Sequence, residues 1–228
     1  MMKKLLFFLL IITFSFAQSH LYIGAGPNNT LFNFSTTVKL KDGTSDKISF
    51  GDGVPIKGFH ITIGATGDDG KLYLRYAKTK EDASDYEIES VYFAYAKYLF
   101  NNKYFKPFVG FSASVNQFSG TVFRETKSGS YDDGTTLHID VLNIYDKYTY
   151  FALASVDFIA GFDSFYKNIM FGVEYYYTAL ATLLPNGGVD RIVYSSERGE
   201  VIDTQTIDID KIENVKNHQI NFTISYLF

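Results

Sequence analysis

The chain ends on INFTISYLF, residues 220–228, a stretch in which apolar and polar residues alternate as far as Ser225. This period of two is typical of a β-strand with two different faces. Chain ends are usually polar and frayed, yet this one closes on an aromatic residue. The stretch therefore predicts a final strand that seals a barrel and turns its apolar face to lipid. The residues of that face are Ile220, Phe222, Ile224, Tyr226 and Phe228.

Further runs with the same period precede this one, and together they predict eight strands. The first begins at about Leu21, and the others lie at 59–66, 71–78, 88–100, 107–117, 149–162, 168–177 and 217–228. In the first run the apolar residues change parity after Pro27, toward Phe32 and Phe34. We therefore expect a β-bulge at Pro27-Asn28-Asn29, because a bulge inserts one extra residue into a strand.

The connections between these runs alternate between long and short along the chain. The longer ones span 41–55, 79–87, 119–148 and 181–216, and the short ones span 67–70, 101–105 and 163–167. In an up-and-down barrel, alternate connections lie at opposite ends, and transmembrane barrels have short periplasmic turns and longer extracellular loops. The pattern predicts an all-β fold, an antiparallel up-and-down transmembrane β-barrel of eight strands.

The long loops themselves contain alternating segments, at 136–145, 189–195 and 200–209. They are expected to continue strands beyond the bilayer, with residues 196–199 as the tip of a hairpin. If two of them crossed the membrane, the barrel would have ten strands.

Residues 1–17, MMKKLLFFLLIITFSFA, have the composition of a secretory signal peptide helix, with cleavage expected between Ala17 and Gln18. Its apolar run is shorter than the about 20 residues of a transmembrane helix. Residues 18–228 would then be the barrel domain. Removal of Lys3 and Lys4 leaves 19 of the 21 basic residues against 25 acidic ones, a net charge of −6, which argues against nucleic acid as a partner. No cysteine is present for disulfides or lipid attachment.

The two faces of the strands differ in a way that indicates which one is inside. One face carries mainly Gly, Ser, Thr, Asn, Ala and Tyr, which suit a narrow lumen, whereas Phe111, Phe171 and Phe222 represent the bulky opposite face. Aromatic residues gather near strand ends, where membrane barrels have aromatic girdles. These are Tyr76, Tyr98, Phe100, Tyr104, Phe105, Phe108, Tyr175, Tyr177, Tyr226 and Phe228.

The sequence resembles the small bacterial outer-membrane β-barrel proteins of the OmpA-barrel and OmpX-like kind. The resemblance lies in INFTISYLF with its terminal Phe228, in KPFVGFSASV at 106–115 and in MFGVEYYYT at 170–178. It implies the outer membrane of a Gram-negative bacterium, contact with membrane lipids and lipopolysaccharide, and a monomer. It also implies that the barrel-assembly machinery reads the final strand. No peptidoglycan-binding domain follows, so a stand-alone barrel is expected.

An eight-stranded barrel is just wide enough for side chains to fill it. The charged or protonatable residues expected to point inward are His60, Arg75, Asp157 and Glu174. Because buried charges need partners, Arg75 is expected to pair with Glu174 or Asp157. Such a lumen network would act as a structural plug, and the alternative is a narrow channel.

The resemblance also includes barrel enzymes that modify lipids, so we considered an enzyme acting on lipopolysaccharide. Catalysis needs a nucleophile, a base and an orienting group together. The best candidates are His138 and Asp140, with Ser128 and Ser130 nearby in the chain. A His/Asp pair two residues apart is common by chance in exposed strands, so no catalytic residues and no cofactor are predicted.

The favoured function is therefore a structural or surface-interaction role, in adhesion or shielding, exercised through the extracellular loops. A protruding β-ribbon can pair with foreign strands by edge addition, so a host or surface ligand is a possible partner. Asp208 and Asp210 share one face of a strand and offer oxygen ligands that calcium prefers. A solvated acidic face explains them equally well, and no metal site is predicted.

Overall fold

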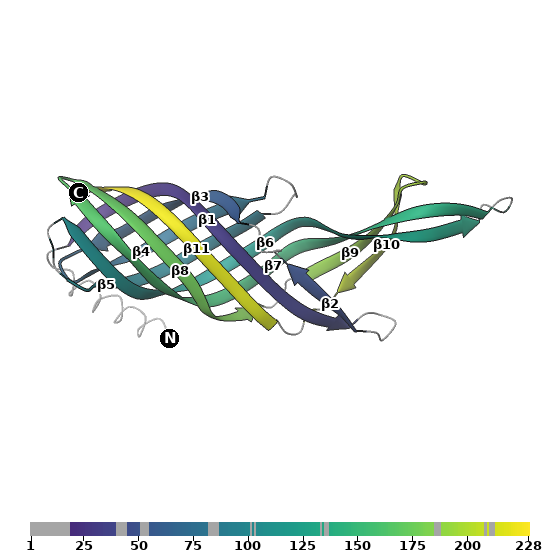
Figure 1. Cartoon of the computed structure of the whole chain (residues 1–228), viewed down its shortest axis with the longest axis horizontal. Helices are drawn as coiled ribbons and strands as arrows, with labels where there is room; N and C mark the ends of the chain where they lie inside the picture. The colour runs from purple at the N-terminus through teal and green to yellow at the C-terminus, as the bar shows by residue number, and fades with distance from the viewer. Residues whose placement is uncertain are drawn as a thin grey trace, which may run out of the picture.

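The computed structural model describes residues 19–228 except for 40–44, 51–54, 82–86, 101, 103, 133, 135–136, 185–187, 208 and 210–212. The predicted signal peptide, including its cleavage site at Ala17 and Gln18, lies outside the described residues. The described chain forms an elongated barrel, and two ribbons extend beyond one of its ends (Figure 1). No helix among the described residues has the length and apolarity needed to cross a bilayer.

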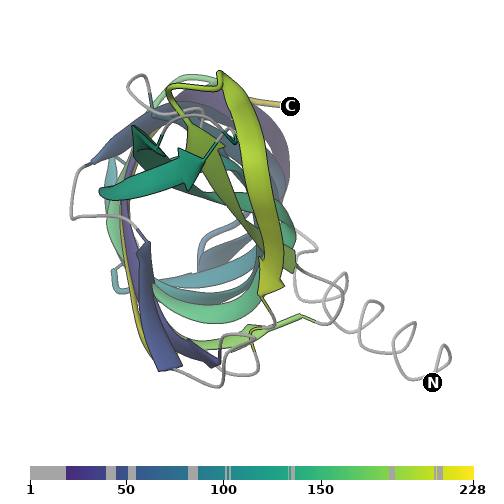
Figure 2. The same cartoon turned by 90° about the vertical axis from the view of Figure 1, so that its right-hand side faces the viewer.

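Eight of the described strands form a closed antiparallel ring (Figure 2). In ring order they are β1 (His20–Lys39), β3 (Ile56–Thr66), β4 (Gly70–Lys80), β5 (Glu87–Tyr98), β6 (Phe105–Asp132), β7 (Leu137–Tyr166), β8 (Ile169–Leu183) and β11 (Glu213–Leu227). The ring closes because β11 pairs with both β8 and β1. This confirms the predicted eight-stranded up-and-down barrel, including the final strand.

Three further strands lie outside the ring, and they show that the ten-strand alternative is wrong. β2 (Ser45–Phe50) pairs only with β1, β9 (Gly188–Ser195) pairs with β7, and β10 (Glu200–Ile207) pairs with β9. β9 meets β7 at residues 142–149, beyond the part of β7 that pairs with β8. The predicted hairpin tip at 196–199 is confirmed as the turn between β9 and β10.

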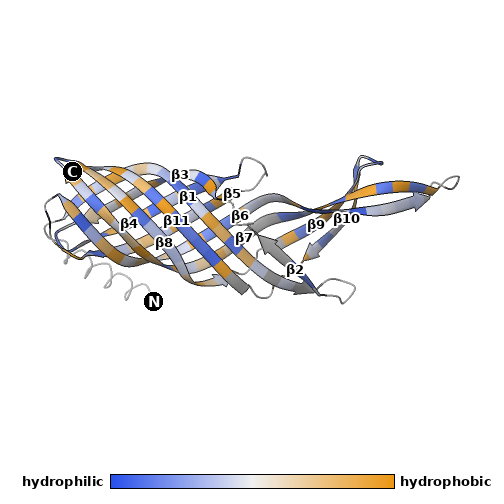
Figure 3. Cartoon of the chain, in the orientation of Figure 1, coloured by the Kyte–Doolittle hydropathy of each residue, from blue (hydrophilic) through white to orange (hydrophobic). Residues whose placement is uncertain are grey.

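Buried and exposed side chains alternate along most of each membrane-crossing strand, for example in β5, and hydrophilic and hydrophobic residues alternate along the strands in Figure 3. Phe111, Phe171 and Phe222 are 58%, 45% and 48% exposed on the outside rather than packed in a core. Lumen-facing positions are buried and mostly small or polar. The predicted orientation, with bulky apolar residues toward lipid, is therefore confirmed.

The predicted bulge at Pro27-Asn28-Asn29 is wrong. β1 pairs with β3 in one unbroken register from His20 to Thr30. Phe32 and Phe34 instead keep the inward parity of Tyr22 and are buried in the lumen. The apolar residues change faces because the lumen itself becomes apolar toward the long loops.

Two of the aromatic residues assigned to the lipid-facing girdle are also corrected. Tyr98 and Phe108 are buried in the lumen, whereas the other eight are exposed on the outer surface or at the rim. The inward parity of Ala94 and Ala96 continues to Tyr98, so position near a strand end does not decide which face a residue occupies.

Strands β6 and β7 are far longer than a membrane crossing needs, at 28 and 30 residues. β5 accompanies β6 only as far as Ser119, but β6 and β7 remain paired out to Asp132 and Leu137. We call the part formed by residues 120–132 and 137–148 the β6–β7 ribbon. Long loop 119–148 of the sequence is thus mostly regular strand.

The outward orientation of Phe111 predicts the effect of a charge at this position. Phe111 lies near the middle of the membrane-crossing part of β6, so Phe111→Arg should destabilise the barrel by about 2–4 kcal/mol, the usual range for a cation at the bilayer midplane. Urea titration of folding into lipid vesicles measures this loss. The matched variant Tyr166→Arg, at the short-turn rim, should lose only about 0–1 kcal/mol. Equal losses at both positions would contradict the assigned membrane depth.

Candidate functional site

A cluster of four charged side chains fills the end of the lumen that is nearest to the short turns. Arg75 on β4 forms an ion pair with Glu174 on β8. Lys71 lies four residues before Arg75 on β4, nearer the short turns. It donates to Glu174 at 2.7 Å and to Asp163 at 2.9 Å. All four side chains are almost completely buried. Two cations and two carboxylates give a net charge of zero, which is what burial away from water demands.

Tyrosine hydroxyl groups complete the hydrogen bonding of this charged cluster. The hydroxyls of Tyr73 and Tyr176 lie 2.6 Å apart, and Arg75 donates to that of Tyr176 at 2.9 Å. Tyr98 donates to Asp163 at 2.8 Å. The Lys71 ammonium also lies 3.8 Å from the centre of the Phe108 ring, a cation–π contact. Tyr98 and Phe108, which were predicted to belong to the lipid-facing girdle, therefore stabilise the charged cluster in the lumen.

Of the remaining two predicted lumen residues, Asp157 lies in a hydrogen-bonded group of its own, and His60 is linked to Arg75 through Thr223. Asp157 accepts from hydroxyl groups, including Ser112 at 3.0 Å and Thr178 at 2.5 Å. The ring of His60 lies 2.9 Å from the hydroxyl of Thr223, which Arg75 also reaches at 3.4 Å. Arg75 was predicted to pair with Glu174 or Asp157. In the structure it pairs with Glu174, whereas Asp157 is surrounded by hydroxyl groups.

Lys71 and Asp163 were not among the predicted lumen residues: Lys71 is the first residue of the strand predicted at 71–78, and Asp163 was assigned to the connection 163–167. The signal was present: Lys71 is two residues before Tyr73, and Asp163 has the parity of Asp157. Applying the period of two to the first residue of the strand at 71–78, and extending it by one step beyond the strand at 149–162, would have placed both residues in the lumen.

An apolar cluster closes the lumen at the opposite end, toward the long loops. Its buried members are Phe32, Phe34, Ile56, Ile88, Phe118, Leu153, Val189 and Ile207. The rings of Phe32 and Phe118 lie 4.7 Å apart between centroids. Val189 and Ile207 come from the β9–β10 hairpin, which therefore covers this end of the barrel. The described lumen thus has a charged layer toward the short turns and an apolar layer toward the long loops.

Ionic contacts at the rim hold the β9–β10 hairpin in this position. Arg191 of β9 contacts Asp146 of β7 at 3.0 Å and Asp46 of β2 at 2.9 Å. Arg124 of β6 contacts the same two carboxylates, at 3.2 Å and 2.6 Å. Partial burial opposes ionisation of Asp46, but the guanidinium groups of Arg191 and Arg124 outweigh it and hold its pKa below the usual value. The four residues tie β2, β6, β7 and β9 together outside the membrane.

The residues considered for catalysis do not come together. In the ribbon, Ser128 pairs with Val141 and Ser130 with Ile139, whereas His138 and Asp140 lie on the opposite face because they pair with Tyr131 and Gly129. Asp140 accepts from the hydroxyl of Ser195 at 2.5 Å and from the backbone N–H of Glu197, and these hydrogen bonds hold its pKa below the usual value. His138 stacks on Tyr131 at 4.8 Å.

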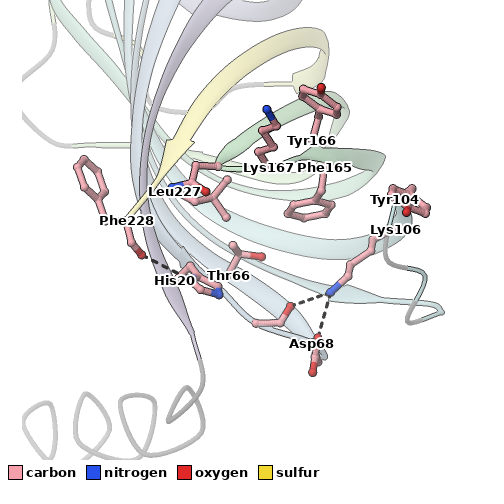
Figure 4. A pocket seen from close by; sticks show the side chains of 12 residues that line it. His20, Thr66, Asp68, Tyr104, Lys106, Phe165, Tyr166, Lys167, Leu227 and Phe228 are labelled. Carbon is pink, nitrogen blue, oxygen red and sulfur yellow. Dashed lines mark hydrogen bonds and ion pairs between the residues drawn. The ribbon is translucent and has the colours of Figure 1, made fainter.

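A cavity of about 1060 Å³ lies at the short-turn end of the barrel (Figure 4). Lys106 reaches Asp68 and the carbonyl of Gly67 at its edge, both at 3.3 Å. The ring of His20 lies 3.3 Å from the carbonyl of Phe228, which ties the first and last strands together. The cavity leads inward toward Thr66, whose hydroxyl contacts that of Tyr98 at 2.8 Å. The cavity thus opens at the short-turn end of the barrel and ends at the charged layer.

Within the described parts of the chain, no group of three or more histidine, aspartate or glutamate side chains is arranged to hold a metal ion. Asp208 and Asp210, considered for calcium, lie outside the described residues.

The closed ring, its apolar outer surface and its side-chain-filled lumen define the class of this fold: it is a small eight-stranded β-barrel of the transmembrane type. Known structures with this fold share little sequence with it. OprG from Pseudomonas aeruginosa is 12% identical, with a TM-score of 0.50 over 91% of this chain and 96% of its own.

Two further structures are similar over most of their length. Neisserial surface protein A is 13% identical over 91% of this chain and 97% of its own, with a TM-score of 0.41. The attachment invasion locus protein Ail of Yersinia pestis is 12% identical over 92% and 99%, with a TM-score of 0.39. No family model matches the chain. No curated protein matches it either.

The charge balance of the lumen predicts the effect of neutralising one member. Glu174→Gln removes the carboxylate shared by Lys71 and Arg75 and leaves an uncompensated buried cation, so it should destabilise the barrel by about 3–5 kcal/mol. Equilibrium unfolding in lipid vesicles measures the loss. The double variant Arg75→Gln/Glu174→Gln keeps the pair of Lys71 and Asp163 and should be more stable than Glu174→Gln alone. A double variant of lower stability would contradict the proposed balance.

The rim contacts predict a pH dependence outside the membrane. Because the folded-state pKa of Asp46 is lowered, its stabilising effect is complete above the ordinary aspartate pKa of about 4. It is lost as the pH falls through the lower folded-state value. The protection factors of the β9 amides, which compare their exchange with the intrinsic rate at each pH, should therefore fall in this acidic range. In Asp46→Asn, the protection factors should be lower already at pH 7 and should change less on acidification. Identical pH profiles for both proteins would rule out this role of Asp46.

Proposed function

We propose that this barrel is a non-catalytic surface protein that contacts a host or surface ligand through its extracellular ribbons, in adhesion or shielding. The observation that carries the proposal is a row of apolar side chains on one face of the β6–β7 ribbon, well outside the membrane. Leu137, Ile139 and Val141 are all exposed, and Ile139 is 79% exposed.

Contact with lipid does not explain why these apolar residues of the β6–β7 ribbon are exposed. On the barrel, apolar side chains face acyl chains, but the ribbon extends beyond the ring into water (Figure 1). Contiguous apolar groups exposed to water mark interaction surfaces. Strand edges outside the ring add backbone groups that can pair with another chain. Both features support a contact role for the ribbon.

The geometry gives less support to the other two candidates. Ser128 and Ser130 face away from His138 and Asp140, so the ribbon does not assemble a nucleophile with a base. A narrow channel would require ions to cross the apolar cluster around Phe118 after leaving the charged layer, at a large desolvation cost. The proposed assembly signal in the final strand is compatible with all three functions.

Attachment measurements test this proposal. Bacteria that display the protein should bind to cultured host cells or immobilised extracellular matrix more than bacteria that lack it. The double variant Ile139→Asp/Val141→Asp should reduce attachment at least about tenfold, which corresponds to about 1.4 kcal/mol. Heat-modifiability on gels verifies that the barrel folds. Thr204→Asp, on the exposed face of β10, serves as a matched control and should leave attachment unchanged. Attachment that persists in the double variant would count against the apolar row as the contact surface.

A further inference from the structure

The outer wall of the barrel contains a groove of about 550 Å³ in the part of the ring formed by β5, β6, β7 and β8. The groove crosses these four neighbouring strands, and its lining is almost entirely apolar. Phe93 lies at its β5 end, and Leu180 and Thr182 lie at its β8 end. The groove is therefore a feature of the lipid-facing surface, separate from the lumen and from the ribbons.

An aromatic ridge borders the groove on the side nearer the short turns. Phe111 on β6 pairs with Tyr95 on β5 and with Phe158 on β7. Phe158 pairs in turn with Tyr177 on β8. All four side chains are exposed on the outer surface, and the rings of Tyr95 and Phe111 lie 6.2 Å apart between centroids. The four rings thus form a raised edge across the same four strands as the groove.

Shorter side chains form the floor of the groove beyond this ridge. Ala113 is the next outward residue after Phe111 on β6, and it pairs with Val156 on β7. One step further along both strands, Val115 pairs with Ala154. Methyl and branched aliphatic groups therefore take the place of aromatic rings, and the wall is lower here than at the ridge.

A β-bulge on β8 separates the ridge from the groove. Thr178 pairs with Asp157, but the partner of Val156 is Leu180. Ala179 is therefore the extra residue of the bulge, and both Ala179 and Leu180 are exposed although they are consecutive. Bulges bend a strand and increase its local twist. The bend turns Leu180 outward, to 69% exposure, so that it forms a wall at the β8 end of the groove.

The groove rises obliquely through one half of the membrane. Phe93 lies five residues from Tyr98, where β5 ends at the short turns. Leu180 lies 11 residues from Ile169, where β8 begins at the same rim. At about 3.3 Å per residue and a tilt of about 45°, this difference of about six residues is a rise of roughly 14 Å, half of the roughly 30 Å hydrocarbon core. The groove thus runs from the bilayer centre at Phe93 to the boundary on the long-loop side.

This path is that of a single acyl chain in the leaflet on the long-loop side. Because lipid tails are as apolar as aliphatic side chains, burial alone does not favour binding in the groove, and retention of a chain depends on van der Waals contacts. A groove contacts a chain on more than one side and so provides more of these contacts than a convex barrel wall. A second copy of the barrel would present another convex wall, which fits the hollow less well.

We propose that the groove between the aromatic ridge and Leu180 binds one acyl chain of a bilayer lipid, with the headgroup near Thr182 and the end of the chain near Phe93. The barrel then carries this lipid as a bound component, whereas lipids along the rest of its wall exchange freely. This inference is independent of the contact function proposed for the ribbons.

Lipid retention after mild extraction tests the proposal. Full-length barrels in vesicles of a single phosphatidylcholine are extracted into mild detergent, and native mass spectrometry counts the lipids that remain bound. The wild type should retain one lipid per barrel. Ala154→Phe fills the floor of the groove and should reduce the retained fraction at least about tenfold. The matched control Ala160→Phe, at an exposed position of β7 outside the groove, should retain the lipid. Heat-modifiability on gels verifies that each variant folds.

Tryptophan fluorescence locates the retained chain. The sequence contains no tryptophan, so Phe93→Trp introduces a single reporter at the bilayer-centre end of the groove. In vesicles of lipid brominated near the end of the acyl chain, Phe93→Trp and the control Ile63→Trp should both be quenched, because Ile63 is exposed on the outer face of β3. After extraction into detergent, Phe93→Trp should stay quenched and Ile63→Trp should recover. Addition of Ala154→Phe to Phe93→Trp should remove the residual quenching.

Several outcomes would overturn the proposal. They are a wild type that retains no lipid, equal retention by Ala154→Phe and Ala160→Phe, and recovery of Phe93→Trp to the same extent as Ile63→Trp. Because the chain has no cysteine, Ala113→Cys supplies a single thiol in the groove. Efficient disulfide-linked dimers of this variant in vesicles would assign the groove to a second copy of the chain instead of a lipid.

Discussion

The absence of water in the hydrocarbon core is the constraint on which this structure depends. Each backbone N–H and C=O at that depth must find a partner within the protein, so a sheet that crosses the membrane has to close on itself. Closure is made between the two ends of the chain: β1 pairs with β11, and the N–H of Phe228 donates to the carbonyl of Leu21 at 2.9 Å. Once the ring is closed, the period of two sends one set of side chains to lipid and the other into the lumen.

Closure also explains the contents of the lumen. Eight strands leave a space that side chains can fill, and water is largely excluded from it. Polar groups there must satisfy one another, which accounts for the neutral set of Lys71, Arg75, Asp163 and Glu174 and for its tyrosine hydroxyls. Toward the long loops, the lumen is filled instead by aromatic and aliphatic residues, two of which the β9–β10 hairpin supplies.

Beyond the membrane the constraint no longer applies, and the architecture changes accordingly. Water can satisfy the backbone there, so β6 and β7 continue as a ribbon with open edges, and β2, β9 and β10 join them outside the ring. Ionic contacts among Asp46, Arg124, Asp146 and Arg191 replace ring closure as the means of holding these strands. The parts of the chain that extend into water are therefore attached to a closed, side-chain-filled barrel.

The period of two and the alternation of connection lengths were sufficient to predict the strand number, the topology and the outward position of Phe111, Phe171 and Phe222. These are local properties, because each residue's face follows from its neighbours along the strand. Which lumen residues meet depends on contacts across the ring, between strands far apart in the chain. The pairing of Arg75 with Glu174 and the contribution of Lys71 and Asp163 were therefore decided only when closure fixed the relative heights of all eight strands.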